Sequence, residues 1–232
     1  MLTASEHRCH RQQFSAFGRI AAHRHLTSYA TLVLAGSYHE AGESGRWKIQ
    51  PGMLVVHAAG EAHADWFGGH STELISFELG APLAAGAYWC ADPDALARRL
   101  LAGAEEPLLP ESSLKPVAGE HDWPDQLAET LRRDPATSIG DWAAHQGLRP
   151  ESVSRGFARA YGVTPAAYRS GVRIMGAVNS LADREQSLAQ IALEHGFADQ
   201  SHMTRALRAE IGFTPGQLRK VKSVQEGSFR VA

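Results

Sequence analysis

The sequence is poor in cysteine and contains no long apolar run. Two cysteines, Cys9 and Cys90, among 232 residues exclude a disulfide framework and suit a reducing cytoplasm. No stretch approaches the roughly 20 apolar residues of a membrane-spanning helix, and the charges of Glu6 and Arg8 argue against a secretory signal. Because 44% of the residues are hydrophobic and 21% are charged, wholesale disorder is excluded. We expect a cytoplasmic protein of two compact domains with no membrane partner.

Charge and histidine are unevenly distributed along the chain. Residues 1–120 carry nine Lys and Arg against thirteen Asp and Glu, a net charge of −4, whereas residues 121–232 carry fourteen against twelve, a net charge of +2. Eight of the twelve histidines lie within the first 70 residues. This change in composition predicts that the two halves form different domains.

Short apolar runs rich in β-forming residues occupy the first half. Examples are residues 30–34, 53–56 and 73–77, and glycines or a Pro-Gly pair separate such runs between about 14 and 79. Regularly spaced short strands predict an antiparallel β-sandwich or barrel. We place this domain at residues 1–91.

A helix is predicted at 92–104, with Asp92 as its cap and Leu96, Leu100 and Leu101 at helical spacing. We expect this apolar stripe to contribute to a dimer interface, and its packing on the barrel is the alternative. Three prolines at 107, 110 and 116 then predict a linker, so residues 92–134 connect the domains.

The helical half contains an internal repeat with a period of 50 residues. Ser138 and Ser187 each begin a capping-box pattern, and Gly147 and Gly196 end the helices that follow. A second helix then leads to the motif Gly-x-Thr-Pro, at 162–165 and again at 212–215. The repeat predicts two helix-turn-helix units between residues 135 and 222, followed by a tail at 223–232.

The second helix of each unit presents polar side chains away from its apolar stripe. Arg can bind guanine bidentately, Gln can bind adenine, and Ser or Thr can bind phosphates or bases. An ordinary solvated helix face also favours Arg and Gln, and it is the alternative. The candidate DNA-binding residues are Glu151, Ser154, Arg155 and Arg159 in the first unit and Gln200, Ser201, Thr204 and Arg205 in the second.

Residues from about 135 to 220 resemble the AraC/XylS-type DNA-binding domain. The resemblance rests on residues 191–205 and 212–215, and more loosely on 148, 154–157 and 161–168. It implies two helix-turn-helix subdomains joined by a long helix, here about 172–181. It also implies that both recognition helices enter successive major-groove segments on one face of double-stranded DNA, roughly 34 Å apart.

The same resemblance implies base or backbone contacts from the candidate residues, Arg159 excepted. Glu151 departs from the chemistry expected, because a carboxylate repels phosphate and would have to accept from a cytosine amine. The net charge of +2 is modest for a DNA-binding segment. Strong affinity would therefore need two copies, and we expect a homodimer, with RNA polymerase as a partner if the protein is an activator.

His23 and His25 are predicted to share one face of a strand, because strand side chains alternate. Two such imidazoles and a third from a neighbouring strand would provide much of a metal site. The alternative is that the imidazoles line a sensor pocket and bind a polar ligand or each other. His39, Glu40, His57 and His70 are interpreted as ordinary surface or edge residues.

Residues 14–80 resemble the two motif blocks of cupins, a fold often fused to AraC-type domains. The resemblance implies a small antiparallel barrel with a ligand pocket in its mouth, and it identifies His23, His25 and His63 as metal ligands. The position of the usual motif glutamate is Tyr29, so a redox iron site is disfavoured. Zn²⁺ or another divalent ion with an open fourth position is favoured.

Aromatic residues near these blocks are candidates for the walls of the ligand pocket, since barrel mouths lined by rings are common small-molecule sites. Plain core packing is the alternative. The candidates are Tyr29, Tyr38, Trp47 and Trp66.

Together these features predict an α+β protein of two domains, with an N-terminal cupin-like antiparallel β-barrel and a C-terminal all-α pair of helix-turn-helix subdomains. The predicted function is transcriptional regulation, in which the barrel senses a small molecule or a divalent metal and the helices bind DNA. A metal-dependent cupin enzyme, of the dioxygenase or isomerase type, with an appended helical domain is the alternative. The missing glutamate counts against the enzyme.

Overall fold

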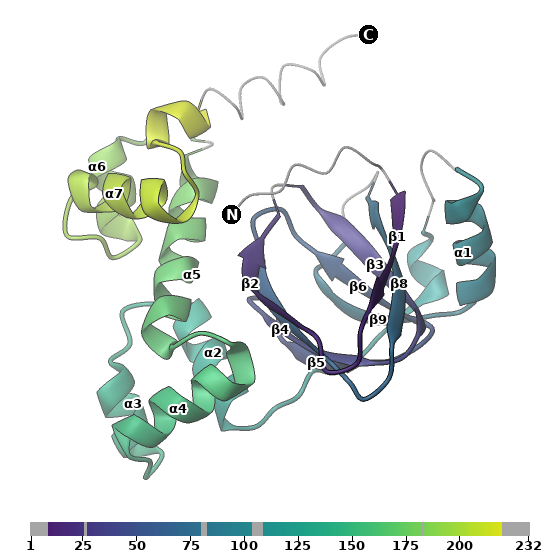
Figure 1. The fold of residues 1–232 in the computed structure, drawn as a ribbon. Coiled ribbons are helices and arrows are strands. Elements are labelled where there is room, and N and C mark those ends of the chain that lie inside the picture. The colour runs from purple at the N-terminus through teal and green to yellow at the C-terminus, as the bar shows by residue number, and fades with distance from the viewer. Residues whose placement is uncertain (1–8, 26, 80–82, 104–108, 182, 220–232) are drawn as a thin grey trace, which may run out of the picture. The chain divides into compact units, whose positions relative to one another are not determined.

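The computed structural model describes residues 9–25, 27–79, 83–103, 109–181 and 183–219 (Figure 1). The predicted linker proline Pro107 and the predicted tail lie outside these residues. The chain divides into two compact units: unit 1 comprises 1–128 together with 153–164, and unit 2 comprises 129–152 and the residues from 165 onward. Within the described ranges, no helix is both long and apolar enough to cross a membrane.

Unit 1 contains an antiparallel β-domain of two sheets, which confirms the predicted β-rich N-terminal half. One sheet has the strand order β1-β8-β3-β6-β9-β10 and the other has the order β2-β7-β4-β5. The strands are β1 (Cys9–Phe14), β2 (Arg19–Arg24), β3 (Tyr29–Ala35), β4 (Tyr38–Gly42), β5 (Arg46–Ile49), β6 (Met53–His57), β7 (Ala62–Phe67), β8 (Thr72–Glu78), β9 (Gly86–Cys90) and β10 (Leu114–Pro116).

Strand alternation divides the apolar residues of the larger sheet between two cores. Leu32 of β3 and Ile75 of β8 belong to one core, which includes residues of helix α1 (Pro93–Leu101). Val33, the next residue of β3, belongs to the other core, together with Trp47 and Phe67 of the smaller sheet. The larger sheet is therefore buried on both faces, which explains its nearly continuous apolar runs.

Helix α1 begins where the sequence predicted, because the Asp92 carboxylate accepts a hydrogen bond from the Ala95 N–H at 2.8 Å. The predicted role of its stripe in a dimer is corrected for two of the three leucines. Leu96 and Leu100 are buried in the core beside the larger sheet, so the alternative of packing on the barrel holds for them. Only Leu101 of the three is exposed, at 52%.

The remaining helices follow the predicted repeat. Ser138 and Ser187 both cap as expected, and Ser187 completes a reciprocal capping box with Gln190. Gly147 and Gly196 have φ values of +66° and +74°, the left-handed conformation that favours glycine after a helix. The helices are α2 (Trp123–Arg133), α3 (Ile139–His145), α4 (Pro150–Tyr161), α5 (Pro165–Ser180), α6 (Leu188–Glu194) and α7 (Gln200–Glu210), and a short 3-10 turn spans Glu111–Ser113.

Helix α5 is longer than the predicted connecting helix at 172–181. It begins at Pro165 because proline is well suited to the first turn, where its missing N–H has no partner to lose. In unit 2, helices α5, α6 and α7 pack together. Their contacts bury Ile174, Ile191 and Met203.

Candidate functional site

A cavity of about 400 Å³ is lined by residues of both sheets. Tyr29, Thr31 and Ser76 reach it from the larger sheet, and Tyr38 and Phe67 reach it from the smaller one. The hydroxyls of Thr31 and Ser76 lie 3.1 Å apart and satisfy each other. The volume of the cavity lies within the usual range for small-molecule sites. One part of its wall is formed by histidine side chains and another part by the carboxyl groups of Glu40 and Asp65.

The histidine part of the wall brings together the three predicted metal ligands. One ligand atom from each of His23, His25 and His63 lies within 4.8 Å of the others. The ring centroids of His23 and His63 are 4.3 Å apart, and those of His23 and His25 are 4.9 Å apart. His25 lies just beyond the end of β2, so the prediction that both residues are within one strand is correct only for His23. A fourth imidazole, His57, lies 4.2 Å from His63 between ring centroids.

These imidazoles are held in the neutral form. Burial lowers the pKa of all four histidines, His23, His25, His57 and His63. Neighbouring imidazoles lower the pKa of His25, His57 and His63 further, and the pKa is about 4 for His25 and about 3 for His57. His23 Nδ1 lies 3.0 Å from the Ala21 carbonyl oxygen, so it donates there and leaves the lone pair on Nε2.

The cluster fits a divalent cation by the chemistry of its donors. The Nδ1 atom of His63 is buried without a hydrogen-bond partner, and neutral imidazoles offer the lone pairs that Zn²⁺ requires. The Tyr29 hydroxyl lies 3.1 Å from His63 Nε2, in the position of the motif glutamate. Three nitrogen donors without an adjacent carboxylate suit zinc better than an octahedral redox metal.

The carboxyl part of the wall was missed by the sequence analysis. Glu40 of β4 and Asp65 of β7 are paired directly across the smaller sheet, and they are 1% and 6% exposed. Burial raises the pKa of both carboxyls, and the carboxyl of Asp65 raises that of Glu40 further; the pKa of Asp65 rises to about 7. The Tyr38 hydroxyl donates to Glu40 Oε2 at 3.3 Å.

The interpretation of Glu40 and His57 as surface residues is therefore wrong. His57 is 2% exposed, and its Nε2 lies 3.7 Å from Glu40 Oε2. Strand alternation could have revealed the carboxyls, because Glu40 is two residues from Tyr38 and Asp65 is two from His63, both of which were predicted to face inward. His39 and His70 are exposed as expected.

The four aromatic candidates separate into two groups. Tyr29 and Tyr38 line the cavity. Trp47 and Trp66 do not, which corrects their predicted role: Trp47 belongs to the core between the sheets, and Trp66 lies half-buried on β7. Trp66 alternates with Asp65 along β7, so the two side chains leave the strand on opposite faces.

The candidate DNA-binding residues lie on α4 and α7, and their side chains are accessible. Glu151, Ser154, Arg155 and Arg159 of α4 and Gln200, Ser201 and Arg205 of α7 are exposed. Thr204 is half-buried, and its hydroxyl donates to the Gln200 carbonyl oxygen at 2.8 Å. The apolar stripes of the same helices face inward, at Val153 and Phe157 in α4 and at Met203 and Leu207 in α7.

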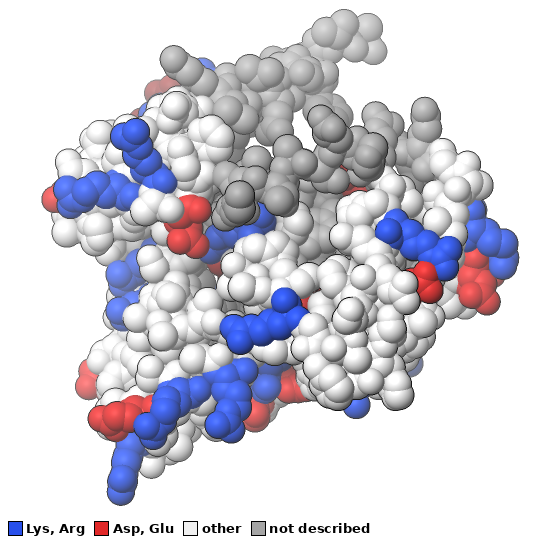
Figure 2. Space-filling view, in the orientation of Figure 1, with Lys and Arg blue, Asp and Glu red and all other residues white. Residues whose placement is uncertain are grey.

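Acidic groups accompany the basic ones around α4. Figure 2 shows Lys and Arg side chains over the region where Figure 1 labels α4, with Asp and Glu side chains beside them. On this face, the surface around α4 is therefore mixed in charge (Figure 2). Any sequence preference would depend on individual side chains more than on a broad positive field.

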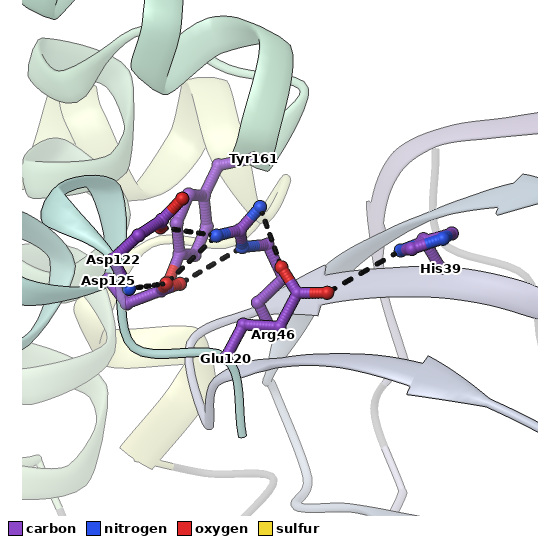
Figure 3. A network of polar contacts seen from close by, with 6 residues as sticks. All are labelled: His39, Arg46, Glu120, Asp122, Asp125 and Tyr161. Carbon is purple, nitrogen blue, oxygen red and sulfur yellow. Dashed lines mark hydrogen bonds and ion pairs between the residues drawn. The ribbon is translucent and has the colours of Figure 1, made fainter.

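A network of polar contacts holds the end of α4 within unit 1 (Figure 3). Arg46 of β5 donates to both carboxylate oxygens of Asp125 in α2, at 3.0 and 2.9 Å. It also pairs with Glu120 at 3.0 Å and with Asp122. Tyr161, the last residue of α4, donates to Asp125 Oδ1 at 2.8 Å. Asp125 therefore receives hydrogen bonds from a strand and from a candidate recognition helix.

Two glycines of this region allow close packing on tryptophan. A side chain at Gly156, in the middle of α4, would collide with the Trp123 indole of α2. At Gly162, just after α4, a Cβ atom would lie 3.2 Å from the Trp66 ring, and φ is +74°. Helix α2 therefore contacts α4 through Trp123, and β7 contacts the residue after α4 through Trp66.

Comparisons with known proteins identify the helical half. A family described as "Helix-turn-helix domain" matches residues 142–221. The virulence regulon transcriptional activator VirF of Yersinia enterocolitica is 38% identical over 89 residues, which are 38% of this chain and 33% of VirF. The regulator ExsA of Pseudomonas aeruginosa is 33% identical over 84 residues, which are 36% of this chain and 30% of ExsA. The match thus spans about a third of the length of these relatives.

Two solved structures that match the chain cover 41% and 90% of it. A probable AraC family transcriptional regulator from Rhodopseudomonas palustris is 25% identical over 41% of this chain and 92% of its own, with a TM-score of 0.38. Unsaturated fatty acid bound ToxT from Vibrio cholerae is 11% identical over 90% of this chain and 93% of its own, with a TM-score of 0.40.

Residues 142–221 form a helix-turn-helix domain, the class of fold that presents one helix of each unit to DNA. Over this domain the chain is similar to known transcriptional regulators, VirF and ExsA among them.

Proposed function

We propose that the protein is a sequence-specific DNA-binding transcriptional regulator whose N-terminal β-domain binds an effector. The observation that carries the proposal is that the candidate base-contacting side chains on α4 and α7, apart from the half-buried Thr204, are exposed. The apolar stripes of the same two helices are buried within a helix-turn-helix domain. The identity of 38% with a transcriptional activator over this segment supports it.

Helices α4 and α7 would each enter a major-groove segment. Arg155 and Arg205 lie on the exposed faces and can bind guanine through O6 and N7, and Gln200 at the start of α7 can bind adenine. Ser154 and Ser201 can bind phosphates or base edges. Glu151 would select against phosphate and for a cytosine amine, so its replacement by Gln should relax the preference at one base pair.

The cavity between the sheets would bind the effector, either a small molecule or a divalent metal at His23, His25 and His63. Zn²⁺ would there supply a positive charge and an open coordination position. An effector shifts DNA binding only if it binds one conformation or assembly better than another. We further propose a cytoplasmic homodimer, and contact with RNA polymerase if the protein activates transcription.

Selection of bound sequences from random double-stranded DNA, with and without a metal chelator, tests the proposal. On the selected site, Arg155→Ala and Arg205→Ala should each weaken binding by roughly tenfold to a hundredfold in fluorescence anisotropy. Arg98→Ala, which removes an exposed arginine from α1, is the matched control and should bind like the wild type. Failure to enrich any sequence, or equal effects of all three substitutions, would contradict the proposal.

Salt dependence gives a second measurement. Each phosphate contacted should contribute about −0.9 to the slope of log K against log salt concentration. A slope near zero would argue against phosphate contacts and would favour the alternative of a metal-dependent enzyme. A purified protein that contains no metal would count further against that enzyme, because the enzyme would require a bound metal for turnover.

A further inference from the structure

The paired carboxyls of the cavity have a chemistry that the three-histidine cluster does not explain. Glu40 Oε1 and Asp65 Oδ1 are buried and have no hydrogen-bond partner among the described residues. Both residues line the cavity. Direct cross-strand pairing places their side chains next to each other, an arrangement in which two ionised carboxylates repel each other unless a cation or a proton lies between them.

The surroundings supply little compensation for these acids. Tyr38 donates only to Glu40 Oε2, and that hydrogen bond is long at 3.3 Å. The nearest imidazole nitrogen, His57 Nε2, is 3.7 Å from the same oxygen. A buried acceptor left unpaired is costly, so the arrangement favours a ligand that brings hydrogen-bond donors.

The rest of the nearby wall is aromatic and apolar. Phe14 and Phe67 stack with their centroids 4.4 Å apart, and Tyr38 and Phe67 are 5.5 Å apart. Leu74 also lines the cavity. Aromatic faces attract cations and accept the apolar body of a ligand, whereas the carboxyl pair repels an anion.

A second metal is a poorer occupant for this end of the cavity. Among the described residues, His23, His25 and His63 form the only group of three or more His, Cys, Asp or Glu side chains with ligand atoms close enough for one ion. Glu40 and Asp65 supply two carboxyls without a third ligand at that spacing. Donor groups of an organic cation can bond two carboxylates without a coordination shell.

We propose that the effector of this regulator is an organic amine whose ammonium group binds between Glu40 and Asp65. The ammonium would donate to Glu40 Oε1 and Asp65 Oδ1, and its apolar part would lie against Phe14, Phe67 and Leu74. This inference rests on the proposed sensor function and names the chemical class that the cavity recognises.

Benzylamine, benzyl alcohol and benzoate share one ring and differ in charge, so they serve as probes. Isothermal titration calorimetry is performed on the full chain after chelator treatment, so that an amine cannot bind a metal ion. The wild-type protein should bind benzylamine about tenfold or more tightly than benzyl alcohol, and benzoate most weakly. Absent binding of benzylamine, or binding no tighter than that of the alcohol, overturns the inference.

Variants assign the effect to the carboxyl pair. Glu40→Gln/Asp65→Asn should weaken benzylamine binding by about tenfold to a hundredfold and leave benzyl alcohol nearly unchanged. Glu73→Gln is the control, because Glu73 is an acid of β8 that pairs with Arg11 and does not line the cavity. Unchanged binding by the double variant overturns the inference, and the comparison of probes on the wild type still decides it if that variant does not fold.

DNA binding is measured separately by anisotropy on the same preparations. If DNA binds selectively but benzylamine does not bind, the amine inference fails and the regulator proposal stands. If benzylamine binds as expected but no DNA sequence is selected, the regulator proposal fails and the amine site stands.

Discussion

Replacing Arg46 by alanine tests whether α4 is held by the network around Asp125. The guanidinium forms a bidentate pair with Asp125, whose carboxylate also accepts from Tyr161. The Arg46 side chain is 15% exposed and that of Asp125 is 8% exposed. Arg46→Ala therefore leaves a buried carboxylate without its countercharge while the carboxylate stays in place.

The expected loss follows from burial. Breaking a buried pair from one side costs about 3–5 kcal/mol. The lower value, about 3 kcal/mol, applies here because Tyr161 and the Asp122 N–H still donate to Asp125. Glu120 and Asp122 add little, since their side chains are 38% and 62% exposed.

Thermal unfolding followed by circular dichroism measures the effect. A loss of about 3 kcal/mol corresponds to a decrease in midpoint of roughly 10 °C for a unit of this size. Arg11→Ala, which breaks an exposed pair with Glu73, is the control and should leave the midpoint unchanged. The double variant Arg46→Ala/Asp125→Asn should be more stable than Arg46→Ala, because no carboxylate is left uncompensated. A midpoint for Arg46→Ala equal to that of the control would refute the reasoning.

Three further predictions concern other parts of the molecule. Leu100→Ala should lower the free energy of unfolding by about 2–5 kcal/mol in urea, and the exposed Leu101→Ala should leave it nearly unchanged; equal losses would contradict the packing of α1. His63→Ala should abolish zinc binding in calorimetry while the metal-free protein keeps its circular dichroism spectrum, and His70→Ala should bind zinc normally. Burial alone would raise the pKa of Asp125, but the hydrogen bonds from Arg46 and others hold it below its ordinary value. The Asp125 carboxylate therefore stabilises the fold fully above the unfolded pKa of about 3.9, and this contribution is lost as pH falls through the folded pKa. Between about pH 5 and 2 the wild type should lose more stability than Asp125→Asn. Parallel curves of stability against pH for the two proteins would contradict this prediction.

The helical half was predictable because its signals are local. Ser187 and Gln190 cap a helix within one turn, and Gly196 ends it in the left-handed conformation. These choices depend on neighbours in sequence, so the repeat specifies the helices without knowledge of the fold. The length of α5 was underestimated because proline marks both the end of one element and the start of another.

The cavity was only half predictable because its other half depends on strand pairing. His23 and His63 follow motif spacing, but the adjacency of Glu40 and Asp65 depends on the register between β4 and β7. The pairing of Arg46 with Asp125 joins residues 79 positions apart, and no local pattern encodes it. Side chains whose role is set by long-range register therefore needed the structure.

The assignment of residues 153–164, which include most of α4, to unit 1 affects where the chain can be cut. A fragment starting at residue 135, the boundary that the repeat suggests, would discard α2 and with it the Trp123 indole beside Gly156 and the carboxylate that receives the Tyr161 phenol. Starting near residue 121 retains both but removes Arg46, the countercharge of Asp125. Shortened versions intended for crystallisation with an oligonucleotide should therefore include α2, because without it α4, the first candidate recognition helix, loses these contacts.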